Sequence, residues 1–121
     1  MPKVAIRKLF CTDVELDVWQ PVSDTDVRFW VSMEIGMVGN GGADIFQVMV
    51  ATPDGLKRGS EHEEVIVDRG VIILHRFSWP ILRRALDAVV KKCECNDWIE
   101  ASTRLQRFFF WEYEDYVMEA R

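Results

Sequence analysis

The chain has 121 residues and a formal net charge of −5, with 49% hydrophobic and 29% charged residues. This composition excludes intrinsic disorder, and the acidic balance argues against nucleic acid as a direct partner, which would need clustered Lys and Arg. Three cysteines without framework spacing argue against a disulfide-stapled secreted domain. No apolar run approaches the roughly 20 residues of a membrane span. We therefore expect one cytoplasmic domain over residues 1–121, with no membrane contact.

The first half of the chain predicts a strand followed by a β-hairpin. Residues 3–11 are rich in β-branched and apolar side chains, and residues 27–37 alternate apolar and polar side chains, as a strand with one buried face does. The glycine-rich turn at 39–42 supplies positions that tolerate positive φ, so the return strand is expected over 43–52. Residues 12–26, which connect the first strand to the hairpin, contain acidic side chains and no basic one.

The middle of the chain predicts a short helical turn and two short strand segments. Thr52 suits a helix cap and Pro53 the first helical position, while glycines soon afterwards keep the helix short. Residues 65–77 then contain two β-rich pieces. The second piece, 71–74, is apolar on both faces, and this pattern favours a central strand of the sheet.

Two helices are predicted in the last third, one beginning at Ser78 and one at Asn96-Asp97. Each has an apolar stripe at helical spacing, formed by Leu82, Leu86, Val89 and Cys93 in the first and by Trp98, Ala101, Leu105 and Phe108 or Phe109 in the second. The closing segment FFFWEYEDY loses the helical period and could run as a final strand or an extended segment. The expected fold is α+β: an antiparallel sheet of about four to five strands with two C-terminal helices packed on one face.

Catalytic and metal-binding motifs are missing from the sequence. His62 lies in a polar loop and His75 at the end of an apolar strand, and no further histidine completes a zinc-binding helix motif. Cys93 and Cys95 have metal-like spacing, but no second cluster supplies the remaining ligands that zinc takes. No Gly-x-Ser-x-Gly elbow and no phosphate-binding loop occur. We therefore expect no catalytic residues, no metal and no cofactor.

The closing motif WEYEDY combines three aromatic and three acidic side chains in six residues. One interpretation is that the rings complete the core while the acids face water. The other is that the segment offers charge and aromatic anchors to a protein partner, because interface hot spots favour Trp and Tyr. The candidate binding residues in this segment are Trp111, Glu112, Glu114, Asp115 and Tyr116. Asp24 and Asp26, in the acidic connection, form a second candidate surface.

Several parts of the sequence resemble the immunity protein 8 family of bacterial polymorphic toxin systems. The resemblance rests on the hairpin strand F-x-V-x-V-A-T-P from Phe46 to Pro53, the D-W-I-E helix start from Asp97 to Glu100, and above all WEYEDY. It covers nearly the whole chain in order and length. One departure is Asp54-Gly55-Leu56, where the family resemblance would favour a longer polar segment with an aromatic residue.

The resemblance implies a small non-enzymatic cytoplasmic protein that binds the C-terminal toxin domain of a contact-dependent or secreted effector and blocks it. Many such toxins are nucleases, whose basic active-site grooves an acidic inhibitor could occupy directly. The aromatic and acidic residues of the family would correspond here to Trp98, Trp111, Glu112, Glu114, Asp115 and Tyr116. The alternative is an interaction or homodimeric scaffold domain that uses the same surfaces for another partner. A small hydrolase is a third hypothesis.

Overall fold

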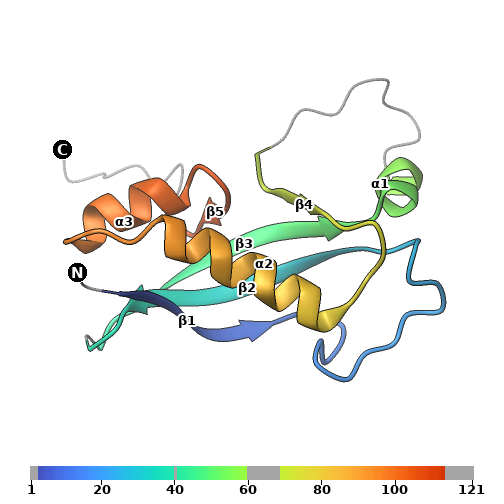
Figure 1. The fold of residues 1–121 in the computed structure, drawn as a ribbon, viewed down its shortest axis with the longest axis horizontal. Helices are drawn as coiled ribbons and strands as arrows, with labels where there is room; N and C mark the ends of the chain where they lie inside the picture. The colour runs from blue at the N-terminus through green and yellow to red at the C-terminus, as the bar shows by residue number, and fades with distance from the viewer. Residues whose placement is uncertain (1–2, 40, 60–68, 114–121) are drawn as a thin grey trace.

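A computed structural model describes residues 3–39, 41–59 and 69–113. In chain order its elements are β1 (Val4–Phe10), β2 (Arg28–Met37), β3 (Asp44–Ala51), α1 (Pro53–Gly59), β4 (Val71–Ile73), α2 (Trp79–Lys92), α3 (Trp98–Leu105) and β5 (Phe110–Trp111). The strands form one open, five-stranded sheet, and two of the helices follow it near the C-terminus (Figure 1). The predicted α+β fold class is confirmed, but the sheet is mixed and not wholly antiparallel as expected, because β4 runs parallel to β3.

The first three strands form the antiparallel part of the sheet. β1 pairs with β2, and β2 pairs with β3 in the hairpin that the alternating pattern predicted. On the inner face of the hairpin, Val31 lies opposite Val48 and Met33 opposite Phe46, and all four side chains are fully buried. Gly39 follows β2 with a φ of 94°, a conformation that glycine adopts without the steric cost of a side chain.

Among the described strands, residues 71–73 form an edge strand, so the expectation of a central strand was wrong. The strand order is β1-β2-β3-β4, and β4 runs parallel to β3, with α1 in the connection that a parallel pair requires. Ile72 lies opposite Val50 on the core side, whereas the side chain of Ile73 is 56% exposed. An apolar pattern on both faces therefore did not mean burial on both faces. The other predicted piece, 65–68, lies outside the described residues.

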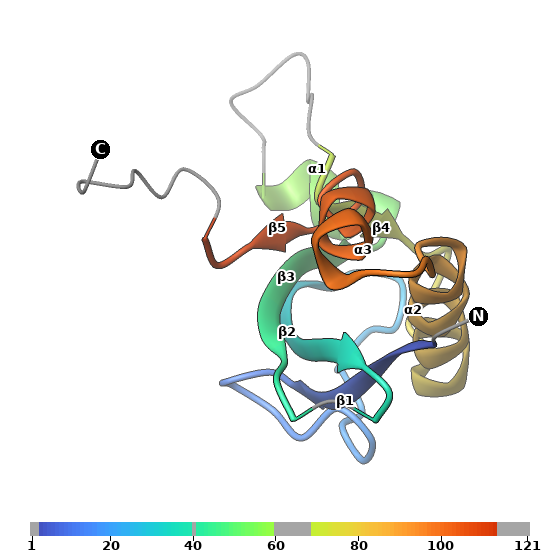
Figure 2. The same ribbon diagram turned by 90° about the vertical axis from the view of Figure 1, so that its left-hand side faces the viewer.

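The sheet curves around α2 and α3, which lie on its inner side (Figure 2). Both helices bury the apolar stripes that their spacing predicted, with Leu82, Leu86 and Leu105 fully buried. One position differs, because the fully buried residue of the third turn of α2 is Val90, while Val89 is partly buried. The carboxylate of Asp97 accepts a hydrogen bond from the N–H of Glu100 at 2.7 Å and caps α3, at the helix start that was predicted at Asn96-Asp97.

The start of α1 is tied to the start of the hairpin by a buried hydroxyl. Thr52 has no solvent exposure, and its Oγ1 accepts hydrogen bonds from the N–H groups of Val27 at 3.0 Å and Gly55 at 3.2 Å. This arrangement confirms Thr52 as the predicted cap. Gly55 lies so close to Val27 that a Cβ at this position would stand 1.9 Å from the Val27 carbonyl oxygen. Glycine is therefore required here for close approach of two backbone segments.

Candidate functional site

The C-terminal candidate site is held to the sheet through one carboxylate. Oδ2 of Asp44 accepts the indole N–H of Trp98 at 3.1 Å and that of Trp111 at 3.0 Å. Asp44 begins β3, Trp98 begins α3 and Trp111 ends β5, so three elements meet at this oxygen. Trp111 lies opposite Phe46, which places its half-buried ring on the inner side of the sheet. The first ring of WEYEDY is thus fixed in position by the fold.

The two residues after Trp111 are exposed. The N–H of Glu112 donates to the carbonyl oxygen of Ile45 at 3.0 Å, so the backbone continues along β3 while the carboxylate faces solvent. The ring of Tyr113 is 47% exposed and packs edge-on against Trp111, with ring centroids 5.2 Å apart. Three of the predicted binding residues lie outside the described part of the chain: Glu114, Asp115 and Tyr116.

The second predicted surface contains two exposed ion pairs. Asp26 pairs with Arg58 at 2.9 Å and Asp24 with Arg76 at 3.4 Å, and the two aspartate side chains are 41% and 45% exposed. Exposed pairs of this kind contribute little to stability, typically up to about 1 kcal/mol. A cation on a partner could therefore replace either arginine at low cost.

The two predicted surfaces do not come together. Trp111 lies opposite Phe46, whereas Arg28, which closely follows Asp26, lies opposite Ala51 at the far end of β3. The stretch of β3 between these positions spans about 17 Å. Figure 1 shows β5 near one end of the sheet and the connection between β1 and β2 near the other.

The connection over residues 12–26, here called the acidic loop, is anchored to the core. The ring of Trp19 packs against Phe29 and Phe77, with centroid distances of 5.2 and 5.0 Å, and Leu16 is only 4% exposed. This packing holds in place the segment that carries three carboxylates. Within the described residues no ion pair neutralises these three, which are Asp13, Glu15 and Asp17.

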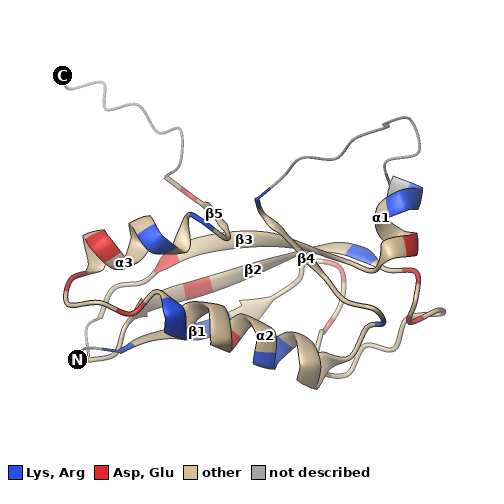
Figure 3. Ribbon diagram, turned by 45° about the horizontal axis from the view of Figure 1, so that its top comes forward, with Lys and Arg blue, Asp and Glu red and all other residues tan. Residues whose placement is uncertain are grey.

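Helix α2 has the opposite charge to the acidic loop. Lys and Arg recur along α2, as Figure 3 shows, and its four basic residues are Arg83, Arg84, Lys91 and Lys92. The helix has a single acidic residue, Asp87, which pairs with Arg83 at 3.1 Å. The surface of this acidic protein is therefore uneven, with negative charge in the acidic loop and positive charge on α2.

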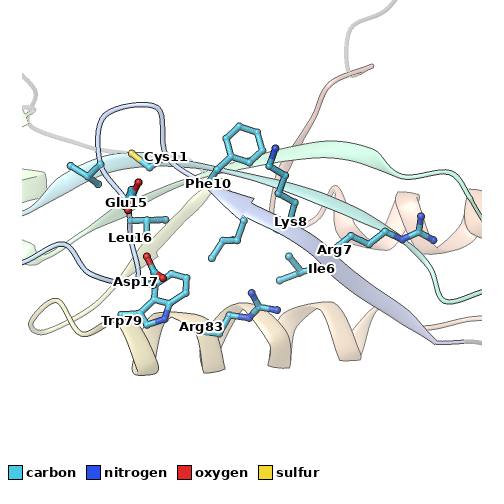
Figure 4. A pocket seen from close by; sticks show the side chains of 12 residues that line it. Ile6, Arg7, Lys8, Phe10, Cys11, Glu15, Leu16, Asp17, Trp79 and Arg83 are labelled. Atoms are coloured by element: carbon cyan, nitrogen blue, oxygen red, sulfur yellow. The ribbon is translucent and has the colours of Figure 1, made fainter.

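A hollow of about 380 Å³ lies between β1, the acidic loop and the first turns of α2. Figure 4 shows Glu15 and Asp17 on the side of the acidic loop, with Asp17 beside Trp79, and Arg83 extending from α2. This mixed lining can hydrogen-bond groups of either charge. Among the residues that the structure describes, no group of three His, Cys, Asp or Glu is placed to hold a metal ion.

The histidines and cysteines that were considered as catalytic or metal-binding residues do not lie together among the described residues. His62 lies outside the described residues, and His75 is exposed just beyond β4. Cys93 and Cys95 are buried, and the Sγ of Cys95 donates to the carbonyl oxygen of Asp97 at 3.5 Å. Burial raises the pKa of the Cys93 thiol above its ordinary value, against the opposing charges of nearby arginines. A buried thiol with a raised pKa is a weak nucleophile.

Sequence reasoning missed an aromatic pair on the outer side of the sheet, formed by an exposed tryptophan and a partly buried phenylalanine. Trp30 on β2 is 45% exposed, and its ring centroid lies 6.0 Å from that of Phe110 on β5. The available signal was the position of Trp30 in the alternating pattern, where it falls on the polar side of the strand between Arg28 and Ser32.

Together these features define a small α+β domain with an open sheet and unevenly charged, partly aromatic surfaces. Residues 4–116 match the family model of Immunity protein 8, which covers nearly the whole chain, and the protein belongs to this family. Family membership indicates a role in toxin neutralisation. No curated protein and no solved structure matched the chain. No helix in the described residues is long and apolar enough to cross a membrane.

Proposed function

We propose that this protein neutralises one cognate bacterial toxin by binding its C-terminal toxin domain directly in a one-to-one complex. The observation that carries the proposal is the family match over residues 4–116. The toxin would belong to a polymorphic or contact-dependent growth inhibition system. The protein acts in the cytoplasm, where it meets the toxin, and it does so by contact rather than by chemistry.

The acidic character of the protein supports a nuclease as the target. Nuclease grooves are basic because they bind phosphate backbones, and a protein with a net charge of −5 is attracted to such a groove. Attraction of this kind accelerates association, by orders of magnitude at low salt. The free carboxylates of the acidic loop add to the field. Occupation of the groove would block access of the nucleic acid.

The proposed contact residues remain those of the two acidic surfaces. The C-terminal set comprises Trp111, Glu112, Glu114, Asp115 and Tyr116, and the second set comprises Asp24 and Asp26. Since Trp111 and the start of β2, just after Asp26, lie opposite positions of β3 that are about 17 Å apart, contact with both calls for a footprint of standard size, about 800 Å² on each partner.

Co-expression rescue tests the proposal. The C-terminal domain of the large protein encoded immediately upstream is induced alone and together with this protein, and surviving cells are counted. We expect survival only with both proteins, and a one-to-one complex on a sizing column. Toxicity that a folded, co-expressed protein does not relieve would contradict neutralisation.

An enzyme assay with the purified toxin domain tests the nuclease and the occlusion separately from neutralisation. Cleavage of labelled DNA and RNA is titrated with this protein. We expect cleavage to stop at an equimolar ratio and nucleic acid to compete with this protein for the toxin. If cells are rescued but the toxin domain cleaves neither DNA nor RNA, neutralisation stands and the proposal that the toxin is a nuclease fails. If cleavage is inhibited but nucleic acid does not compete with this protein, the proposal of direct occlusion fails.

A further inference from the structure

The strand β1 forms one edge of the described sheet, and part of its backbone points away from β2. In an antiparallel ladder, alternate residues exchange hydrogen bonds with the neighbouring strand. The N–H of Val38 donates to the carbonyl oxygen of Lys3 at 2.8 Å, so the even-numbered residues of β2 are those that bond to β1. Leu9 lies opposite Met33, an odd-numbered residue. The N–H and the carbonyl group of Leu9 therefore point outward, away from the sheet.

One outward group of β1 already has a partner. Val4 lies opposite Met37, and its N–H donates to Oε2 of Glu94, which follows α2, at 3.2 Å. The outward groups of Leu9 have no such hydrogen bond among the described residues. Unpaired N–H and carbonyl groups at the edge of a sheet are a template for pairing with another chain. Leu9 is therefore a position where a further strand can be added.

The outward side of Leu9 lies in the hollow of about 380 Å³ between β1, the acidic loop and α2. Residues 6–11 line the hollow one after another along β1, and Trp79 and Arg83 line it from α2. Figure 4 shows β1 on one side, α2 on the other and the acidic loop at one end. The volume lies within the usual range of ligand pockets. A short extended segment could enter here and run along the strand.

The end of the hollow formed by the acidic loop carries negative charge. Glu15 and Asp17 line the hollow with exposed side chains, and neither forms an ion pair within the described residues. Leu16, between them, is only 4% exposed and holds this part of the loop against the core. The two carboxylates are thus available to a cationic partner.

The basic residues that line the hollow have contacts of their own. Arg83 forms its ion pair within α2. Arg7 donates to the carbonyl oxygen of Met37. The Nζ of Lys8 lies 5.3 Å from the centroid of the Phe10 ring, and Figure 4 shows this side chain projecting away from α2. The charges of this hollow that are free to attract a partner are therefore the two carboxylates, and they favour a basic partner.

We infer that the toxin domain docks by strand addition: an extended, basic segment of the toxin forms a hydrogen-bonded pair with Leu9, and its Lys or Arg side chains lie beside Glu15 and Asp17. This inference rests on the proposed function and names the kind of segment that is captured. In strand addition, main-chain hydrogen bonds supply affinity and side-chain contacts supply specificity. A basic segment is also what the groove of a nuclease offers, so docking and occlusion require the same charge.

Amide hydrogen exchange of the wild-type protein, followed by NMR with and without the upstream-encoded toxin domain, tests the inference. We expect the N–H of Leu9 to exchange roughly tenfold or more slowly in the complex, because it gains an acceptor. The control is the N–H of Ile73 in β4. It also points away from the sheet, because Gly70 and Leu74 are the residues that bond to β3. Exchange at Ile73 should change by less than about twofold.

Binding measurements with folded variants give a second readout. L9P removes the outward N–H, and L9A, which loses the same side chain but keeps the N–H, is its matched control. We expect L9P to bind roughly tenfold more weakly than L9A. E15Q/D17N should weaken binding by about fivefold, whereas D54N/E100Q, which removes the same charge from α1 and α3, should stay within about twofold of the wild type. Circular dichroism establishes that each variant is folded.

The outcomes separate this inference from the proposed function. If the wild type neither binds the toxin domain nor protects cells, both fail. If it binds, but the Leu9 amide exchanges equally fast in both states and L9P binds as tightly as L9A, the inference alone fails. If L9P does not fold, exchange at Leu9 in the wild type decides. Slow exchange at Leu9 that is already present in the free protein and is lost on dilution would assign this edge to a second copy instead.

Discussion

The indole N–H of Trp111 donates a hydrogen bond of 3.0 Å to Oδ2 of Asp44. Asp44 begins β3 and Trp111 ends β5, and the antiparallel pairing of these two strands brings the start of one beside the end of the other. The same oxygen also accepts the indole of Trp98. Hydrogen bonds to charged groups contribute about 1.5–3 kcal/mol each, so this carboxylate fastens the last strand and the last helix to the hairpin.

Replacement of Asp44 by alanine should therefore destabilise the protein. D44A removes the acceptor of two partly buried indoles, and we expect the free energy of unfolding in urea to fall by about 2–3 kcal/mol. D44N keeps a neutral acceptor and should lose less. The control D13A changes an exposed aspartate without an ion pair among the described residues and should stay within about 0.5 kcal/mol of the wild type. Equal stability of D44A and D13A would contradict this role of Asp44.

Substitution of Gly55 should destabilise the protein because an added side chain would clash with the backbone of Val27, and not because of the backbone dihedral angles of Gly55. In G55A the new Cβ would stand 1.9 Å from the carbonyl oxygen of Val27, and we expect a loss of about 2 kcal/mol or more, measured by thermal and urea unfolding. The matched control is G41A, where no heavy atom lies within 4 Å of the added Cβ. A G55A protein as stable as G41A would show that α1 and β2 can separate freely.

The stability of the protein should depend on Cys93 at alkaline pH. Because burial raises the pKa of this thiol, the unfolded chain releases its proton at a lower pH than the folded protein does. The stabilisation is therefore complete below the ordinary thiol pKa and is lost as the pH rises above it. We expect the free energy of unfolding of the wild type to fall more steeply above pH 9 than that of C93A. Parallel pH profiles for the two proteins would refute the assignment.

Removal of the aspartates in the acidic loop should affect the rate of association more than the fold. For D24N/D26N we expect slower association with the toxin domain and a weaker dependence of the rate on salt, because the steering field is reduced. Stability should fall by no more than about 1 kcal/mol per ion pair. D87N, which removes an exposed, paired acid on α2, is the matched control. An unchanged salt dependence in D24N/D26N would place the steering charge elsewhere.

The parts of the fold that are encoded locally could be predicted from the sequence. The β2–β3 hairpin follows from strict alternation and a glycine turn, and Asp97 is an N-terminal cap of the kind that short-range chemistry favours. The edge position of β4 could not be predicted, because the apolar composition of a segment does not specify how many strands will pair with it.

The candidate site was less accessible to sequence reasoning because it depends on distant contacts. Nothing near Asp44 in the chain indicates that two indoles will share its carboxylate, since the partners come from the last two elements. Likewise, the exposure of Trp30 depends on which side of the sheet the helices cover. The role of the WEYEDY acids stays a prediction.

The late completion of β3 has a consequence for the synthesis of the protein. One side of β3 is paired by β2 as soon as the hairpin forms, but the other side waits for residues 71–73 and then for residues 110–111. At a translation rate of about 5–20 residues per second, roughly 3–12 seconds separate the emergence of Ala51 from that of Trp111. During this interval part of a strand edge is exposed to other nascent chains. A premature stop codon just before Phe110 would make that exposure permanent, so even a nearly full-length product would be prone to aggregate.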